Sequence, residues 1–100
     1  MENEKKAAPD KEAALKQIRD QFTGTGGREQ ADRLLAALRQ FPISTFEAMR
    51  LLDVYHAPAR VLQLRQAGHQ IITLRQRVET EAGVPHNVGL YVLQRGDGHA

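Results

Sequence analysis

The sequence predicts a small α+β domain in which three helices precede a β-hairpin, with a further helix N-terminal to them. Three observations support this fold class: a leucine-rich helical periodicity over residues 31–41, a helix-capping pattern at 44–47, and two β-branched runs at 70–80 and 87–93. One hundred residues suffice for one domain and not for two.

The composition excludes several classes of site. The chain has no cysteine, which excludes disulfides, thiol catalysis and cysteine-based metal sites and fits a reducing compartment. Its first residues lack the apolar segment of a secretory signal, and no apolar run approaches the roughly 18 residues of a membrane span. The four histidines lack a metal-binding spacing, and residues 24–27 lack the lysine of a phosphate-binding loop. We therefore expect no cofactor, no metal and no enzymatic activity, and a location in the cytoplasm of a bacterial host cell.

The N-terminal quarter reads as an accessory helix outside the main domain. Residues 1–9 predict a disordered tail, residues 10–23 an amphipathic helix, and residues 24–27 a glycine-rich linker. The apolar stripe of this helix must be buried on the domain itself, on a second copy of the chain or on another partner. We take it as the best candidate for a homodimer or partner contact; its residues are Leu15, Ile18 and Phe22.

The first helix of the domain is amphipathic. Its predicted buried face consists of Ala31, Leu34, Leu35, Leu38 and Phe41, which recur at helical spacing. Asp32 and Arg33 fall off that face. Pro42 is expected to stop the helix, and Ile43 to lie in a very short strand.

A second helix should begin at Thr45, because Ser44 and Glu47 form a capping-box pattern. It should end near Asp53. Its buried side is expected to come from Phe46, Met49 or Leu51, and Leu52.

The third helix should span residues 57–67. Pro58 suits the first turn of a helix, where a missing amide hydrogen costs little. Gly68 is placed as the left-handed residue that ends the helix. Its core stripe is predicted to be Ala57, Val61 and Leu64.

Two strands after this helix complete the pattern. The runs at 70–80 and 87–93 predict a hairpin whose turn, at 81–86, contains glycine and proline. Two helices joined by a short turn and followed by a hairpin are typical of a winged helix-turn-helix, here over residues 28–94. Residues 95–100 predict a second disordered tail.

Several stretches of the predicted domain are similar to one known family: residues 28–30, 43–48, 58–61, 64–65, 68–71 and 91–93. Through them, residues 28–93 resemble the small winged helix-turn-helix domains of phages and prophages. The resemblance implies a protein that binds double-stranded DNA, with the helix 57–67 in the major groove and the wing 75–88 on the backbone. The accessory helix lies outside the resemblance.

The charge distribution agrees with a polyanionic partner. The formal net charge is only +2, but residues 50–77 hold five arginines against Asp53 alone. A cluster of basic residues on a nearly neutral chain is typical of a surface that binds nucleic acid. Arginines that merely solvate a surface are an equally good explanation of the charge taken alone.

A helical wheel of residues 57–67 places Ala59, Leu62, Gln63 and Gln66 opposite the core stripe, with Arg60 and Arg65 on the flanks. The glutamines fit adenine edges, the apolar side chains fit thymine methyl groups, and flanking arginines fit phosphates. The full set of predicted DNA-contacting residues is Thr45, His56, Ala59, Arg60, Leu62, Gln63, Arg65, Gln66, Arg75, Arg77 and His86.

Two functions from different classes remain open at this stage. The first is sequence-selective DNA binding by a transcription regulator or by an accessory factor of phage replication or recombination. The second is a protein-binding module, for example a phage inhibitor of a host defence or polymerase complex, which the exposed Leu62 and the accessory stripe favour.

Overall fold

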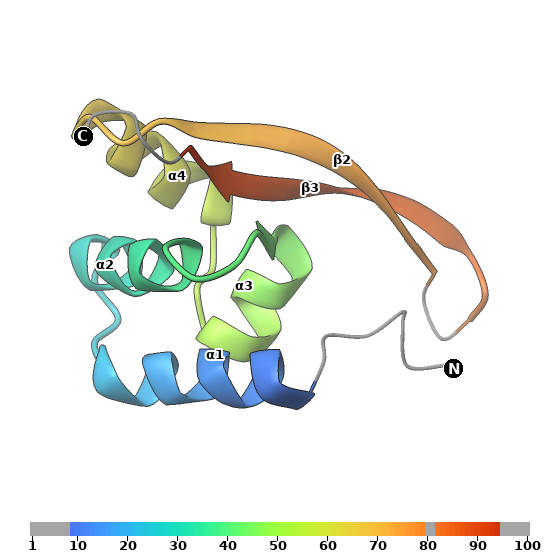
Figure 1. Ribbon diagram of the computed structural model, residues 1–100, viewed down its shortest axis with the longest axis horizontal. Coiled ribbons are helices and arrows are strands. Elements are labelled where there is room, and N and C mark those ends of the chain that lie inside the picture. The colour runs from blue at the N-terminus through green and yellow to red at the C-terminus, as the bar shows by residue number, and fades with distance from the viewer. Residues whose placement is uncertain (1–8, 80–81, 95–100) are drawn as a thin grey trace.

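The computed structural model describes residues 9–79 and 82–94, and it has the α+β architecture that the sequence predicts (Figure 1). A short strand separates the second and third helices, and the hairpin comes last. The elements are α1 (Pro9–Gln21), α2 (Gly27–Leu38), β1 (Ile43–Ser44), α3 (Thr45–Leu52), α4 (Ala57–Gln66), β2 (Ile71–Glu79) and β3 (Pro85–Leu93).

The three strands form one antiparallel sheet in the order β1-β3-β2. β1 pairs with β3 only at Ile43↔Tyr91 and Ser44↔Leu90, whereas β2 and β3 pair along their full lengths. The far half of the hairpin therefore extends beyond β1 and past the helices (Figure 1). The predicted turn at 81–86 is shorter than expected, because Pro85 and His86 already belong to β3.

The core fills the space between the helices and the near end of the sheet. Ala57, Val61 and Leu64 of α4 are buried as predicted, and Ile71 and Tyr91 join them from the sheet. The predicted tails at 1–9 and 95–100 lie outside the described residues, except that Pro9 begins α1. No helix in the two described ranges is long and apolar enough to cross a membrane.

The accessory helix is part of this core, which corrects its assignment as a dimer contact. Leu15 is 0% exposed and Ile18 5% exposed, and both belong to the core shared with α2 and α3. The Lys11 ammonium also donates to the Pro42 carbonyl (3.0 Å) and pairs with Glu47 (3.2 Å). Burial within their own chain removes Leu15 and Ile18 from any partner surface; of the predicted stripe, only Phe22 is exposed.

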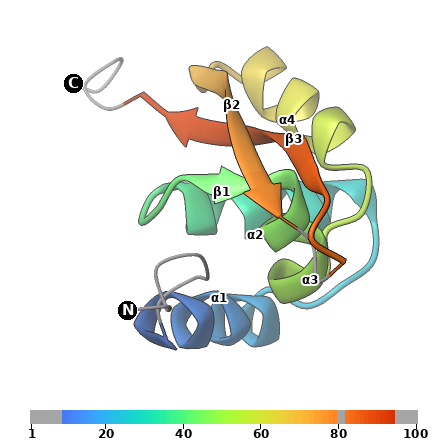
Figure 2. The ribbon, with the colours of Figure 1, turned by 90° about the vertical axis from the view of Figure 1, so that its right-hand side faces the viewer.

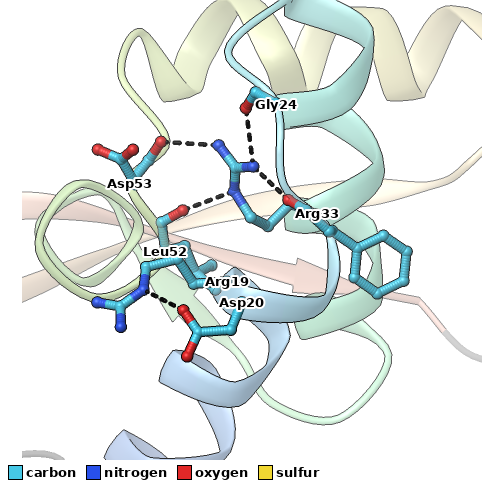
Figure 3. Close-up of polar contacts among 7 residues, drawn as sticks. Arg19, Asp20, Gly24, Arg33, Leu52 and Asp53 are labelled. Carbon is cyan, nitrogen blue, oxygen red and sulfur yellow. Dashed lines mark hydrogen bonds and ion pairs between the residues drawn. The ribbon is translucent and has the colours of Figure 1, made fainter.

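Arg33 is the main surprise in α2: it is 2% exposed, although the helical pattern places it off the buried face. Its Nε donates to the Leu52 carbonyl (2.7 Å) and its Nη2 to the Asp53 carbonyl (2.9 Å), both at the end of α3. Its Nη1 donates to the Phe22 and Gly24 carbonyls just after α1 (Figure 3). One guanidinium thus binds carbonyls at the C-terminal ends of two helices, where a cation is also favoured by the helix dipoles.

Two further expectations for α2 and α3 need correction. α2 ends at Leu38, before the predicted limit at Phe41, because the chain already turns at residues 39–41. Phe46 and Met49 of α3 are exposed, whereas Leu52 is buried as predicted and Leu51, the alternative to Met49, packs against the core. Ala48 is also buried. The capping box of Ser44 and Glu47 is present in full, as predicted.

The ends of α4 follow the local sequence signals. Gly68 has φ +106°, and the amides of Gly68 and His69 donate to the carbonyls of Arg65 and Leu64. This pair of bonds is the Schellman motif that terminates helices at a left-handed residue. At the other end, His56 precedes α4 in the left-handed region with φ 57°.

Candidate nucleic-acid interface

One side of α4 is open to solvent. Val61 and Leu64 point into the core, and the side chains on the opposite side are exposed. The exposed residues are Pro58, Ala59, Leu62, Arg65 and Gln66. Of the residues predicted to contact bases, Ala59, Leu62 and Gln66 therefore lie together on an open helix face.

The exposed face is rotated relative to the predicted one, because α2 covers the other flank of α4. Arg60 and Gln63 are only partly exposed there. A Cβ atom placed on Gly27, at the start of α2, would lie 2.8 Å from Arg60 Nη1. Arg60 Nε and Gln63 Oε1 are buried and lack a hydrogen-bond partner within the described part of the chain. Gln63 thus stands apart from the open face on which the helical wheel places it.

On the opposite flank, Arg65 joins α4 to the wing. Its Nε donates to the Ile71 carbonyl (2.8 Å), and its Nη2 donates to Thr73 Oγ1 (3.0 Å). Alternate residues of a strand point to the same side of a sheet, about 7 Å apart. Arg75 and Arg77 therefore share the side of β2 on which Thr73 meets Arg65. We call Arg65, Arg75 and Arg77 the arginine face; all three are exposed.

The remaining predicted contacts are distributed around this surface. Thr45 is partly exposed, and its hydroxyl donates to the Gly89 carbonyl (3.4 Å), which places the start of α3 beside the wing. His56 is exposed at the start of α4. His86 pairs with Val78, so it points to the opposite side of the hairpin from Arg75 and Arg77 and does not join the arginine face.

One exposed cation of α3 lies outside the predicted set of DNA contacts. Arg50 of α3 is exposed, and its guanidinium lies 5.2 Å from the centre of the exposed Phe46 ring. Arg50 belongs to the basic segment 50–77, whereas the predicted contacts come only from the start of α3, from residues 56–66 and from the hairpin. Within residues 9–79 and 82–94, no three histidine, aspartate or glutamate side chains gather closely enough to hold a metal ion.

Comparison with known proteins agrees with this architecture. The sequence model described as a winged helix-turn-helix domain matches residues 29–96, which is more than half of the chain. No curated protein and no solved structure gives a significant match. Over the matched residues, the structure contains a helix, a short strand, two helices and a hairpin. These are the elements from α2 to β3. The chain belongs to the family of winged helix-turn-helix domains.

Proposed function

We propose that the protein binds double-stranded DNA, with the open side of α4 in the major groove and the arginine face against the phosphate backbone. The observation that carries this proposal is the link from Arg65 to Thr73, which joins the open side of α4 to the strand that carries Arg75 and Arg77. A major groove admits an α-helix, and arginines beside it supply affinity through phosphates.

The residues divide into two roles. Ala59, Leu62 and Gln66 are exposed on α4 and would contact base edges, with the apolar pair suited to thymine methyl groups and the glutamine to adenine. Arg75 and Arg77 are exposed on the wing and would neutralise phosphates without reading sequence. Arg60 and Gln63 are partly buried, so we expect them to contribute less to DNA binding.

We further propose that the protein works without catalysis in the cytoplasm of a bacterial cell, as a phage-type or prophage-type regulator of transcription or as an accessory factor of replication or recombination. The winged helix-turn-helix family match and the local excess of arginine support a nucleic-acid role. The choice among these processes depends on the DNA site that the protein selects.

The first experiment is fluorescence anisotropy with a mixed-sequence duplex over a salt series. We expect a log–log slope equivalent to about four neutralised phosphates. The double variant Arg75→Gln/Arg77→Gln should lower the slope by about two, because two phosphate contacts are lost. The matched control is Lys16→Gln/Arg19→Gln, which removes two cations from α1. Figures 1 and 2 place α1 on the opposite side of the molecule from α4.

Two results would contradict the proposal. One is the absence of binding even at low salt. The other is an equal loss of affinity in the two double variants, which would show that net charge alone, and not the arginine face, attracts the duplex.

A second function is favoured by a specific observation: Phe46, Met49 and Leu62 are 47%, 46% and 53% exposed on α3 and α4. Exposed large apolar side chains suit a protein partner, so the winged helix could instead dock on a host defence or polymerase complex. Leu62→Ser distinguishes the two. It should abolish a protein complex, whereas in DNA binding it should change site preference and leave the salt slope intact.

A further inference from the structure

The wing has a second face that the proposed DNA contact leaves unused. Because β2 and β3 pair without interruption from Ile71↔Leu93 to Glu79↔Pro85, the residues that point away from the arginine face follow from the register. We call them the outer face; they are Ile72, Leu74, Gln76 and Val78 of β2, and His86, Val88, Leu90 and Val92 of β3.

The outer face is apolar and lies outside the core. Six of its eight positions are isoleucine, leucine or valine, and none carries aspartate, glutamate, lysine or arginine. None of the six is among the buried core residues. Four of them are half-buried: Val78, Val88, Leu90 and Val92. Ile72 remains 41% exposed and Leu74 46% exposed. A half-buried hairpin ordinarily turns its apolar side to the core and its polar side to water; in this wing the outer face lies on the side of the strands away from the core residues Ile71 and Tyr91.

We propose that the outer face is an interface between two copies of this chain, which pack their wings face to face. In a two-fold contact the same surface meets itself, so any charge on it is repeated across the interface and repels its copy. The outer face has no formally charged residue, which makes it suited to self-association.

The other route to self-association through the wing is less favourable. β2 is an edge strand of the described sheet, and edge strands can pair with another chain. In an antiparallel pairing of two β2 strands about Gln76, Arg75 of one copy would lie opposite Arg77 of the other. Like charges opposite one another destabilise a strand pair, which disfavours that register.

The size of the face predicts a weak dimer. Two paired strands of nine residues cover an area about 30 Å long and about 10 Å wide. That is roughly 300 Å² per copy, well below the ~800 Å² per partner of a standard stable interface. We therefore expect a weak dimer that forms only as the protein concentration rises. The arginine faces point away from such an interface, so each copy keeps its own DNA-binding surface free.

The test uses the full chain without nucleic acid, so its result is independent of the proposed DNA binding. Sedimentation velocity from about 5 to 500 μM should show a rising average mass for the wild type. Leu74→Lys should remain monomeric over the whole range. The matched control is Glu79→Gln, which raises the net charge by the same amount on the other side of the same hairpin, at the exposed residue paired with Pro85, and should dimerise as the wild type does.

A second measurement distinguishes loss of the dimer from loss of folding. Methyl NMR spectra of the wild type over the same dilution series should show concentration-dependent chemical shifts for Ile72, Leu74 and Leu90. The chemical shifts of the Leu62 methyl groups on α4 should stay constant. Ile72→Lys serves as an independent variant. The proposal is overturned by a wild type that stays monomeric at every concentration. It is equally overturned by dimers that persist in both lysine variants, or by shifts that appear at Leu62 and not on the outer face.

Discussion

Arg65 of α4 is bonded to Thr73 of β2, with 3.0 Å between Nη2 and Oγ1, and the same guanidinium binds the neighbouring Ile71 carbonyl. The two bonds connect the helix proposed to enter the groove with the strand that carries Arg75 and Arg77. Together with the core contacts of Leu64 and Ile71, this side chain helps to fix the angle between helix and wing, which sets how both can meet one duplex.

Thr73→Val removes the hydroxyl that accepts from Arg65 and keeps the branched shape. Because the site is exposed, the free energy of unfolding should fall by only about 0.5 kcal/mol. DNA affinity should fall by a few-fold, since the wing is held less firmly. Anisotropy and urea denaturation measure the two effects. Thr23→Val, at another exposed threonine, is the control; an affinity loss of the same size there would show that the Arg65 link has no role.

Local sequence signals predict much of this fold because their physics is local. The capping box at Ser44 and the helix stop at Gly68 each depend on residues only a few positions apart, and both are confirmed. The core stripe of α4 follows from helical period alone. The hairpin also follows from its residues, although its turn begins and ends at other positions than the pattern indicates.

Features that depend on tertiary contacts could not be predicted in the same way. The burial of Arg33 results from the convergence of the ends of α1 and α3, which no periodicity reveals. The partial burial of Gln63 depends on which flank of α4 lies under α2. The apolar stripe of α1 predicts that this side of the helix is buried, but it does not predict which surface buries it. The structure shows that this surface belongs to the same chain.

Leu15→Ala tests the integration of α1 into the domain. Leu15 is fully buried, so its truncation should lower the free energy of unfolding by about 3 kcal/mol through lost burial and a residual cavity. Leu62→Ala, at a leucine that is 53% exposed, should change it by less than about 0.5 kcal/mol. Both are measured by urea denaturation. Equal small effects would mean that α1 does not contribute to the core.

Arg33→Met removes the shared donor at the ends of α1 and α3 while it keeps a long side chain. Carbonyls left unpaired in a buried site are costly, so the free energy of unfolding should fall by about 3 kcal/mol. Arg33→Lys should recover only part of this loss, because an ammonium cannot reproduce the planar fork. The control is Arg28→Met on the exposed side of α2. Thermal and urea unfolding that fail to separate Arg33→Met from the control would refute this role.

His56 and Asp53 both adopt left-handed backbone conformations in the turn between α3 and α4, with φ of 57° and 56°. Glycine is better suited to this region, so His56→Gly and Asp53→Gly should each stabilise the fold by about 0.5–1 kcal/mol.

The two substitutions should differ in their effects on DNA affinity. If the exposed His56 side chain contacts a phosphate at the start of α4, His56→Gly lowers the affinity despite the gain in stability. Asp53→Gly should leave the affinity equal or raise it, since it removes an acidic group. Urea midpoints and anisotropy on the two variants separate these effects, and an unchanged affinity in His56→Gly would remove this histidine from the proposed interface.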